Sequence, residues 1–137
     1  MNRVPSGWWI LPAILISSVM WSAIILAETI DPSITPTKTL NCDMPVERTD
    51  GTPLALNEIA QIRFYVSTDQ ATWQQAGTNT VCLQVYDLSD VADGTYWYTA
   101  DAVDTEGRES IKSPQAAELI VKRLSPPVNP SNLGWSD

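Results

Sequence analysis

The chain has 137 residues, which allows one domain of ordinary size with little left over. It has no histidine, eight Lys and Arg, and sixteen Asp and Glu, so its formal net charge is −8 at pH 7. The lack of histidine removes the commonest general base and metal ligand, and the acidity disfavours nucleic-acid binding, which needs Lys and Arg to neutralise phosphates.

A long uncharged run, GWWILPAILISSVMWSAIILA, occupies residues 7–27 after a short N-terminus of residues 1–6. As a helix rising about 1.5 Å per residue, it would be roughly 31 Å long, close to the roughly 30 Å hydrocarbon thickness of a bilayer. We therefore expect a single transmembrane helix. Arg3 lies before the run and Glu28 directly after it, which predicts a cytoplasmic N-terminus in the inner (plasma) membrane and a periplasmic or extracellular domain.

The expected helix carries residues suited to an interface and to helix packing. Trp8 and Trp9 lie at its first edge and Trp21 nearer the other, where indole rings favour the headgroup region. Small residues permit close approach of partner helices, and the candidates are Ala13, Ser17, Ser18 and Ser22. The alternative is a signal peptide cleaved after Ala27; against it, the run exceeds the usual apolar region of about 7 to 15 residues, and Ile25 is not small.

Residues 28–67, after the apolar run, have the patterns of short β-strands. Residues 28–37 contain two prolines and are interpreted as an extended linker that becomes a first edge strand. The domain is expected over 38–124, beginning with a half-buried strand over 38–44. Residues 59–67, IAQIRFYVS, alternate clearly, which predicts an inward set and an outward set. The inward set is Ile62, Phe64 and Val66, and the outward set is Arg63 and Tyr65.

The second half of the domain continues the pattern. Residues 68–80 predict a hairpin with a short strand, and 54–62 suggest one helical turn at most. Residues 81–88, VCLQVYDL, predict a strand whose two faces are similarly apolar, so its register stays undecided. Another strand is predicted over 94–104 and a last one over 117–123. The first of these has Tyr96, Tyr98, Ala100 and Ala102 on one face and Trp97, Thr99, Asp101 and Val103 on the other. About seven strands indicate an all-β sandwich.

Two cysteines, Cys42 and Cys82, both follow the apolar run. In an oxidising compartment a lone pair is most often a disulfide, and two buried free thiols are the alternative. After the domain, residues 125–137 form a Pro-rich tail, expected to run semi-extended over the surface or into a partner. Large aromatic residues are enriched at interaction hot spots, and the candidates are Trp73, Trp97 and Trp135.

Four stretches together resemble a fibronectin type III domain of the bacterial and phage-borne kind, over about residues 34–124. They are TLNCDMP, RTDGTPL, IAQIRFYVSTD and DGTYWYTADAVDTEGRES. The resemblance implies a β-sandwich in which Tyr96 is the corner tyrosine and Val91 the apolar residue before that corner. It implies a spacer, adhesion or docking module and no particular activity.

Cys42 stands where the family usually keeps a core tryptophan. If Val91 marks which alternate residues point inward, the resemblance places Cys82 inward beside Cys42. A disulfide then takes the place of the missing core tryptophan ring. If Leu88 sets it, Cys82 is expected to point outward and the bond becomes doubtful.

No catalytic, cofactor or metal site emerges from the sequence. Phosphate-binding GxxxxGK loops and GxGxxG turns are absent. The acids around 87–106 lack the spacing of a calcium loop, so exposed turn acids are the favoured interpretation. We expect a non-enzymatic accessory or scaffolding subunit that docks onto a larger membrane or envelope assembly, without a small-molecule ligand. The alternatives are a secreted adhesion or carbohydrate-binding module, and a virion or filament structural protein.

Overall fold

The structure is a computed structural model that describes residues 27–136. The expected membrane helix over 7–27 lies outside the described residues except for Ala27. The same holds for its interface residues Trp8, Trp9 and Trp21 and its packing residues Ala13, Ser17, Ser18 and Ser22. Between residues 27 and 136, no helix combines the length and the hydropathy that a membrane crossing requires.

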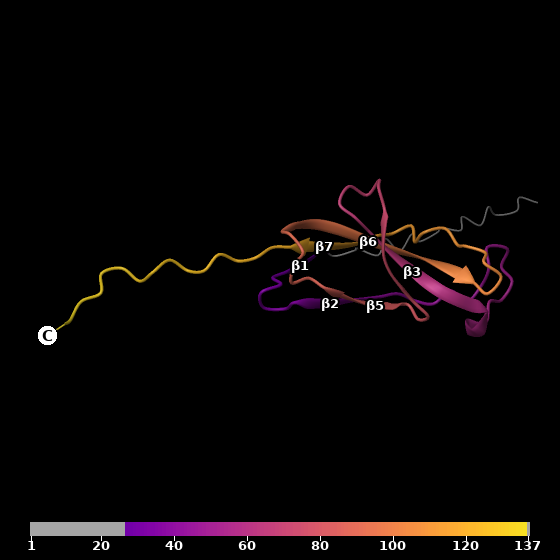
Figure 1. Ribbon diagram of the computed structural model, residues 1–137, viewed down its shortest axis with the longest axis horizontal. Helices are drawn as coiled ribbons and strands as arrows, with labels where there is room; N and C mark the ends of the chain where they lie inside the picture. The colour runs from indigo at the N-terminus through magenta and orange to yellow at the C-terminus, as the bar shows by residue number, and fades with distance from the viewer. Residues whose placement is uncertain (1–26, 137) are drawn as a thin grey trace, which may run out of the picture.

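Seven strands form two sheets in the described part of the chain (Figure 1). One sheet has five strands in the order β1-β7-β6-β3-β4, and the other consists of β2 and β5 alone. The bounds are β1 Glu28–Ile30, β2 Thr37–Asn41, β3 Ile59–Ser67, β4 Gln74–Asn79, β5 Leu83–Asp87, β6 Gly94–Asp104 and β7 Ala117–Val121, with one 3-10 turn, Leu56–Glu58. The expectation of an all-β sandwich of about seven strands is confirmed.

The antiparallel pair of β3 and β6 forms the centre of the larger sheet. From Ile62 to Val66 of β3 and from Tyr96 to Ala102 of β6 the even-numbered residues face the core as predicted, whereas a register shift near the start of β3 brings Ile59 into the core. Phe64 is fully buried and Ile62 nearly so, while Tyr98 and Ala100 on β6 are buried too. The ring of Tyr86 of β5 packs against that of Tyr98 from the other sheet, with ring centroids 4.8 Å apart and ring planes tilted by 45°. The core therefore lies between the two sheets, as in other sandwiches.

Strand β1 lies within residues 28–37, which were interpreted as an extended linker that becomes a first edge strand. Glu28–Ile30 pairs in parallel with β7, so the folded sheet begins ten residues before the expected domain start at residue 38. Two further hydrogen bonds extend this pairing: Lys122 N donates to Ile30 O at 2.9 Å, and Leu124 N donates to an Asp31 carboxylate oxygen at 3.0 Å. The chain thus enters and leaves the domain along adjacent strands.

The corner before β6 has the form that the family resemblance implies. The Tyr96 hydroxyl donates a hydrogen bond to the carbonyl of Ala92 at 2.9 Å, which closes the loop onto the start of the strand. Val91, half-buried, packs against the core next to it.

Removing the corner hydroxyl is expected to destabilise the domain without changing its fold. In the Tyr96→Phe variant the ring stays and one hydrogen bond is lost, so the free energy of unfolding should fall by about 0.5 to 1.5 kcal/mol. Urea unfolding followed by tryptophan fluorescence measures this. A variant as stable as the wild type would show that this corner bond contributes nothing.

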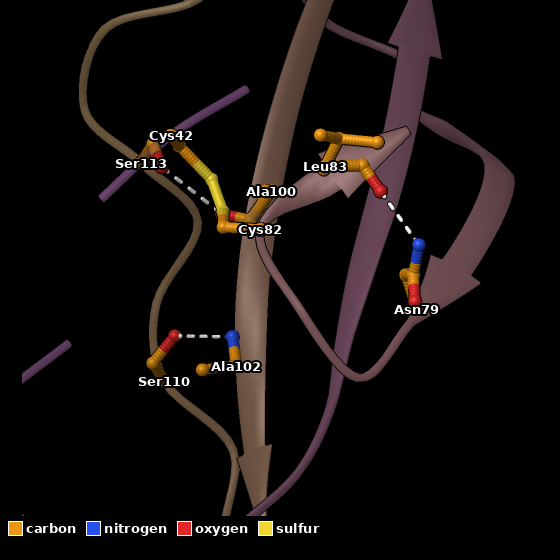
Figure 2. Close-up of a disulfide and its surroundings, with 8 residues drawn as sticks. All are labelled: Cys42, Asn79, Cys82, Leu83, Ala100, Ala102, Ser110 and Ser113. Atoms are coloured by element: carbon orange, nitrogen blue, oxygen red, sulfur yellow. Dashed lines mark hydrogen bonds between the residues drawn. A yellow bond between two sulfur atoms is a disulfide. The ribbon is translucent and has the colours of Figure 1, made fainter. Parts of the chain in front are cut away.

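A disulfide joins Cys42 and Cys82 where the smaller sheet ends (Figure 2). Their Cα atoms are 5.2 Å apart, and Cys42 N donates to Cys82 O at 3.0 Å, which continues the ladder of β2 and β5 by one pair. Cys82 is buried in the same core cluster as Phe64, whereas Cys42 is exposed.

The register of β5 differs from one sequence expectation. Leu88 is fully buried, and Cys82 is buried as well. Residues six apart in a strand share a face because side chains alternate with a period of two. The expectation that an inward Leu88 turns Cys82 outward is therefore wrong.

Candidate functional site

An ion cluster lies on the outer face of the five-stranded sheet, opposite the core. Arg63 of β3 and Asp101 of β6 are direct cross-strand partners. The guanidinium donates from Nε and Nη2 to the two Asp101 oxygens at 2.7 and 2.8 Å, and the Tyr65 hydroxyl donates to Asp101 Oδ2 at 3.0 Å. The Asp101 side chain is only 3% exposed. This is a bidentate pair, the strongest arrangement for arginine and carboxylate.

The segment that connects β6 and β7 holds the cluster in place. Ser113 Oγ donates to Ala100 O at 3.2 Å and Ala102 N donates to Ser110 Oγ at 2.9 Å, so the segment runs beside β6 (Figure 2). From it, Glu109 accepts a hydrogen bond from Arg63 Nη1 at 2.8 Å. The Lys112 ammonium lies 4.2 Å from the centre of the Tyr65 ring, a cation–π contact.

These contacts favour the charged forms of Arg63 and Glu109 and the neutral form of Tyr65. Hydrogen bonds to Asp101 and Glu109 raise the pKa of Arg63, and burial together with Asp101 raises the pKa of Tyr65. The hydrogen bond from Arg63 lowers the pKa of Glu109. Arg63 and Glu109 therefore stay charged and the Tyr65 phenol stays neutral, so the ion pairs and hydrogen bonds of this cluster hold the sheet face in one geometry.

A second cluster surrounds Asp104 at the end of β6. Its carboxylate accepts hydrogen bonds from Arg48 at 2.9 Å and Arg108 at 2.7 Å. Burial by itself would raise the pKa of Asp104, but these bonds and those from backbone amides outweigh it and hold the pKa well below its usual value. An adjoining hollow of about 300 Å³ is lined by both arginines. Because Asp104 pairs with both arginines, Glu58 with Arg48 and Glu106 with Arg108, the hollow has little attraction for an anion.

Acid is expected to destabilise the domain. The pKa of each of several carboxylates is lowered in the folded state, chiefly by hydrogen bonds, and that of Asp69 falls to about 2 through the amides of Thr72 and Ala71. An unfolded aspartate titrates near 3.9, so the unfolded chain takes up protons first and stability falls as pH drops from about 5 towards 2. Thermal melts between pH 7 and 2.5 measure this. Asp69→Asn should flatten the decline, and a melting temperature independent of pH would contradict the assignment.

The acids between residues 87 and 106, which lack the spacing of a calcium loop, do not come together in the structure. Asp101 and Asp104 bind different arginines, and Asp93 pairs with Arg123 at 2.7 Å. Asp87 accepts a hydrogen bond from the Ser89 amide. Within residues 27–136 no group of three metal-ligating side chains is close enough to hold an ion.

The three candidate tryptophans occupy different settings. Trp97 lies on the outer face of β6 as predicted, paired across the sheet with Ser67 and Glu118, and it is half-buried. Trp73, just before β4, is also half-buried. Trp135 is fully exposed in the tail. The structure therefore does not gather them into one aromatic platform.

An apolar stripe on the smaller sheet was not among the predicted sites. Leu83 and Val85 are exposed on the outer side of β5, where they pair with Asn41 and Thr39 of β2, and Val81 just before β5 is exposed too. The signal was present in the sequence, since VCLQVYDL is apolar on both faces. One apolar face fills the core, and the other forms this surface.

Comparisons with known proteins add little beyond the fold. No protein-family model matches the chain, and no curated protein matches it. Among solved structures, the chain is similar to the crystal structure of an Fn3-like protein from Clostridium thermocellum. The TM-score is 0.48 at 20% sequence identity, and the match covers 72% of this chain and 90% of that one. The two-sheet arrangement and the Tyr96 corner carry the fold description by themselves.

Proposed function

We propose that this protein is a non-enzymatic single-pass membrane protein whose extracytoplasmic, fibronectin type III-like domain acts as an accessory or scaffolding subunit. In this proposal residues 7–27 anchor the chain in the bilayer. The domain and its tail dock onto a larger membrane or envelope assembly.

Two features support the placement. The Cys42–Cys82 disulfide is typical of an oxidising, extracytoplasmic compartment. The uncharged run of residues 7–27 has the length of a bilayer span, and it ends next to Glu28, the first residue of β1. A domain that starts directly after its anchor would lie close to the membrane surface, where the outer parts of membrane assemblies are found.

The exposed tail is the observation that carries the docking role. Figure 1 shows it leaving the end of β7 and running away from the sandwich. Its large apolar side chains are almost completely exposed: Val128, Leu133 and Trp135. Three prolines favour an extended backbone and lower the entropy lost on binding. Exposed apolar groups on a pre-extended segment are suited to a partner's groove.

The anchor is tested by intact mass and membrane extraction. We expect the native protein to retain its N-terminal segment, to resist extraction from membranes by alkaline carbonate, and to become extractable when residues 1–27 are deleted. The same spectrum should show a mass about 2 Da lower than the reduced chain, as a disulfide requires. A mature N-terminus at Glu28 would contradict the proposed membrane anchor and favour a secreted module.

The docking role is tested by photocrosslinking from the tail in native membranes. A photoreactive residue at position 135 should give a few discrete adducts with membrane or envelope proteins, and the same residue at position 70, an exposed loop position, should not. Trp135→Ala should weaken binding to the crosslinked partner about 30-fold, as for a hot-spot residue. Equal adducts from both positions, or none from 135, would contradict the proposal.

A further inference from the structure

Strand β2 has a free edge. Within the described residues it pairs with β5 alone. Hydrogen bonds from Cys42 N to Cys82 O and from Leu88 N to Pro36 O show that the even-numbered residues of β2 form the hydrogen-bonded pairs. In an antiparallel ladder the intervening residues turn their N–H and C=O groups to the other side. Thr37, Thr39 and Asn41 therefore direct these groups away from β5.

A side groove of about 130 Å³ lies next to this edge, between β2 and the β1–β7 pair. Its apolar lining comes from both sheets: Leu40, Tyr86, Tyr98, Ala117 and Leu119. These residues belong to the main core or pack against it. The core is thus open on the flank that a further strand beside β2 would cover.

One polar group beside the groove lacks a partner. The Tyr86 hydroxyl is buried, and it forms no hydrogen bond with any described residue. Burial raises the pKa of Tyr86, so the hydroxyl remains a neutral donor. Leaving such a group unsatisfied costs about 1 to 3 kcal/mol. A bound segment that supplies an acceptor would recover part of this cost.

The charged residues at the rim of the side groove favour a bound segment of one charge sign. Lys38 is paired with Glu28 across the flank, while Glu118 forms no ion pair with the described residues. The rim therefore has a net charge of −1. From residue 28 to the end the chain has seven Lys and Arg against sixteen Asp and Glu, a formal charge of −9. A cationic residue in the bound segment complements both the negative rim of the side groove and the negative net charge of the domain.

We propose that the free edge of β2 and the side groove bind an extended segment of a partner protein as an added strand. The segment has apolar residues at alternate positions and a Lys or Arg near Glu118. Its backbone pairs with Thr37, Thr39 and Asn41, and an apolar side chain enters the groove. Lys38, an inward charge on the edge, discourages unspecific strand pairing. This inference rests on the proposed function, because it names the kind of segment that the accessory subunit would bind.

Hydrogen exchange of the full chain in lipid nanodiscs tests the free edge. The amides of Thr37, Thr39 and Asn41 should exchange fast, and those of Lys38 and Leu40, which bond to β5, should exchange slowly. Slow exchange of both sets without any added peptide would mean that another part of this chain already covers the edge. That result would overturn the proposal.

A designed peptide then tests the binding chemistry on the same full chain. The probe is a capped heptapeptide that alternates threonine with valine and ends in lysine. It should slow exchange at Thr37, Thr39 and Asn41 only, and a version ending in glutamate should bind about threefold more weakly. Glu118→Gln should remove this difference between the two peptides. No binding, or protection centred on the free edge of β4, would overturn the proposal.

A matched pair of variants separates backbone pairing from surface adhesion. Thr39→Pro removes one outward N–H without breaking a bond to β5, since proline is tolerated at a sheet edge, and it should weaken binding more than tenfold. Thr39→Val keeps the N–H and should bind like the wild type. Equal binding by both variants would refute strand addition. These results do not depend on the anchor or on position 135, so this inference and the proposed function can fail separately.

Discussion

Replacing Arg63 with methionine is expected to destabilise the domain by about 3 to 5 kcal/mol. The Asp101 side chain is 3% exposed in the wild type, and the substitution leaves its carboxylate with the Tyr65 hydroxyl as hydrogen-bond donor and without its paired cation. A buried charge without its partner costs more than the pair contributes, because desolvation is no longer compensated. Small domains are stable by about 5 to 15 kcal/mol in total, so the loss should be obvious in urea unfolding.

A second substitution shows whether the unpaired charge is the cause. In the double variant Arg63→Met, Asp101→Leu no buried charge remains, and stability should return to within about 1 kcal/mol of the wild type. Glu106→Gln breaks an exposed pair with Arg108 and should cost less than about 1 kcal/mol. A double variant as unstable as the single one would show that the arginine acts through packing and not through its charge.

Removing the disulfide is expected to cost about 4 kcal/mol. Cys42 and Cys82 are 40 residues apart, and closing a loop of that size restricts the unfolded chain by roughly this amount on the chain-entropy model. The measurement compares the urea unfolding of the oxidised wild type with that of the double variant Cys42→Ala, Cys82→Ala. Loss of the buried Cys82 sulfur adds a packing cost to the variant.

The reduced wild type separates the two contributions. It keeps both sulfur atoms but not the bond, so it should lie between the oxidised protein and the double variant. If reduction leaves the free energy of unfolding unchanged, the bond does not stabilise the domain, and burial of Cys82 accounts for the whole effect.

The strands that were easiest to predict are β3 and β6. The bounds 59–67 and the inward residues Ile62, Phe64 and Val66 match β3, and 94–104 matches β6, because strict alternation fixes both the strand and its faces. Strand β5 was harder. Both of its faces are apolar, so hydrophobicity cannot tell which one meets the core.

Pairings between distant residues could not be read from local patterns. The sequence placed Arg63 and Asp101 on the outward faces of their strands, but the register that makes them partners depends on how β3 and β6 align. Strand β1 is only three residues long, and its strand conformation depends on the parallel pairing with β7. The side groove likewise depends on both sheets at once. Trp73 and Trp97 were predicted as contact residues, yet each is partly buried in the domain.

The parallel pairing of β1 and β7 decides how the domain responds to mechanical force. A pull between the residues before Glu28 and those after Val121 acts at opposite ends of two strands that run in the same direction. Such a load slides the strands past each other, so the hydrogen bonds between them bear it together instead of opening one by one. The hydrogen bonds donated by the backbone amides of Lys122 and Leu124 extend the paired region beyond the two strands. The domain is therefore expected to resist such a pull better than strands whose hydrogen bonds open one after another.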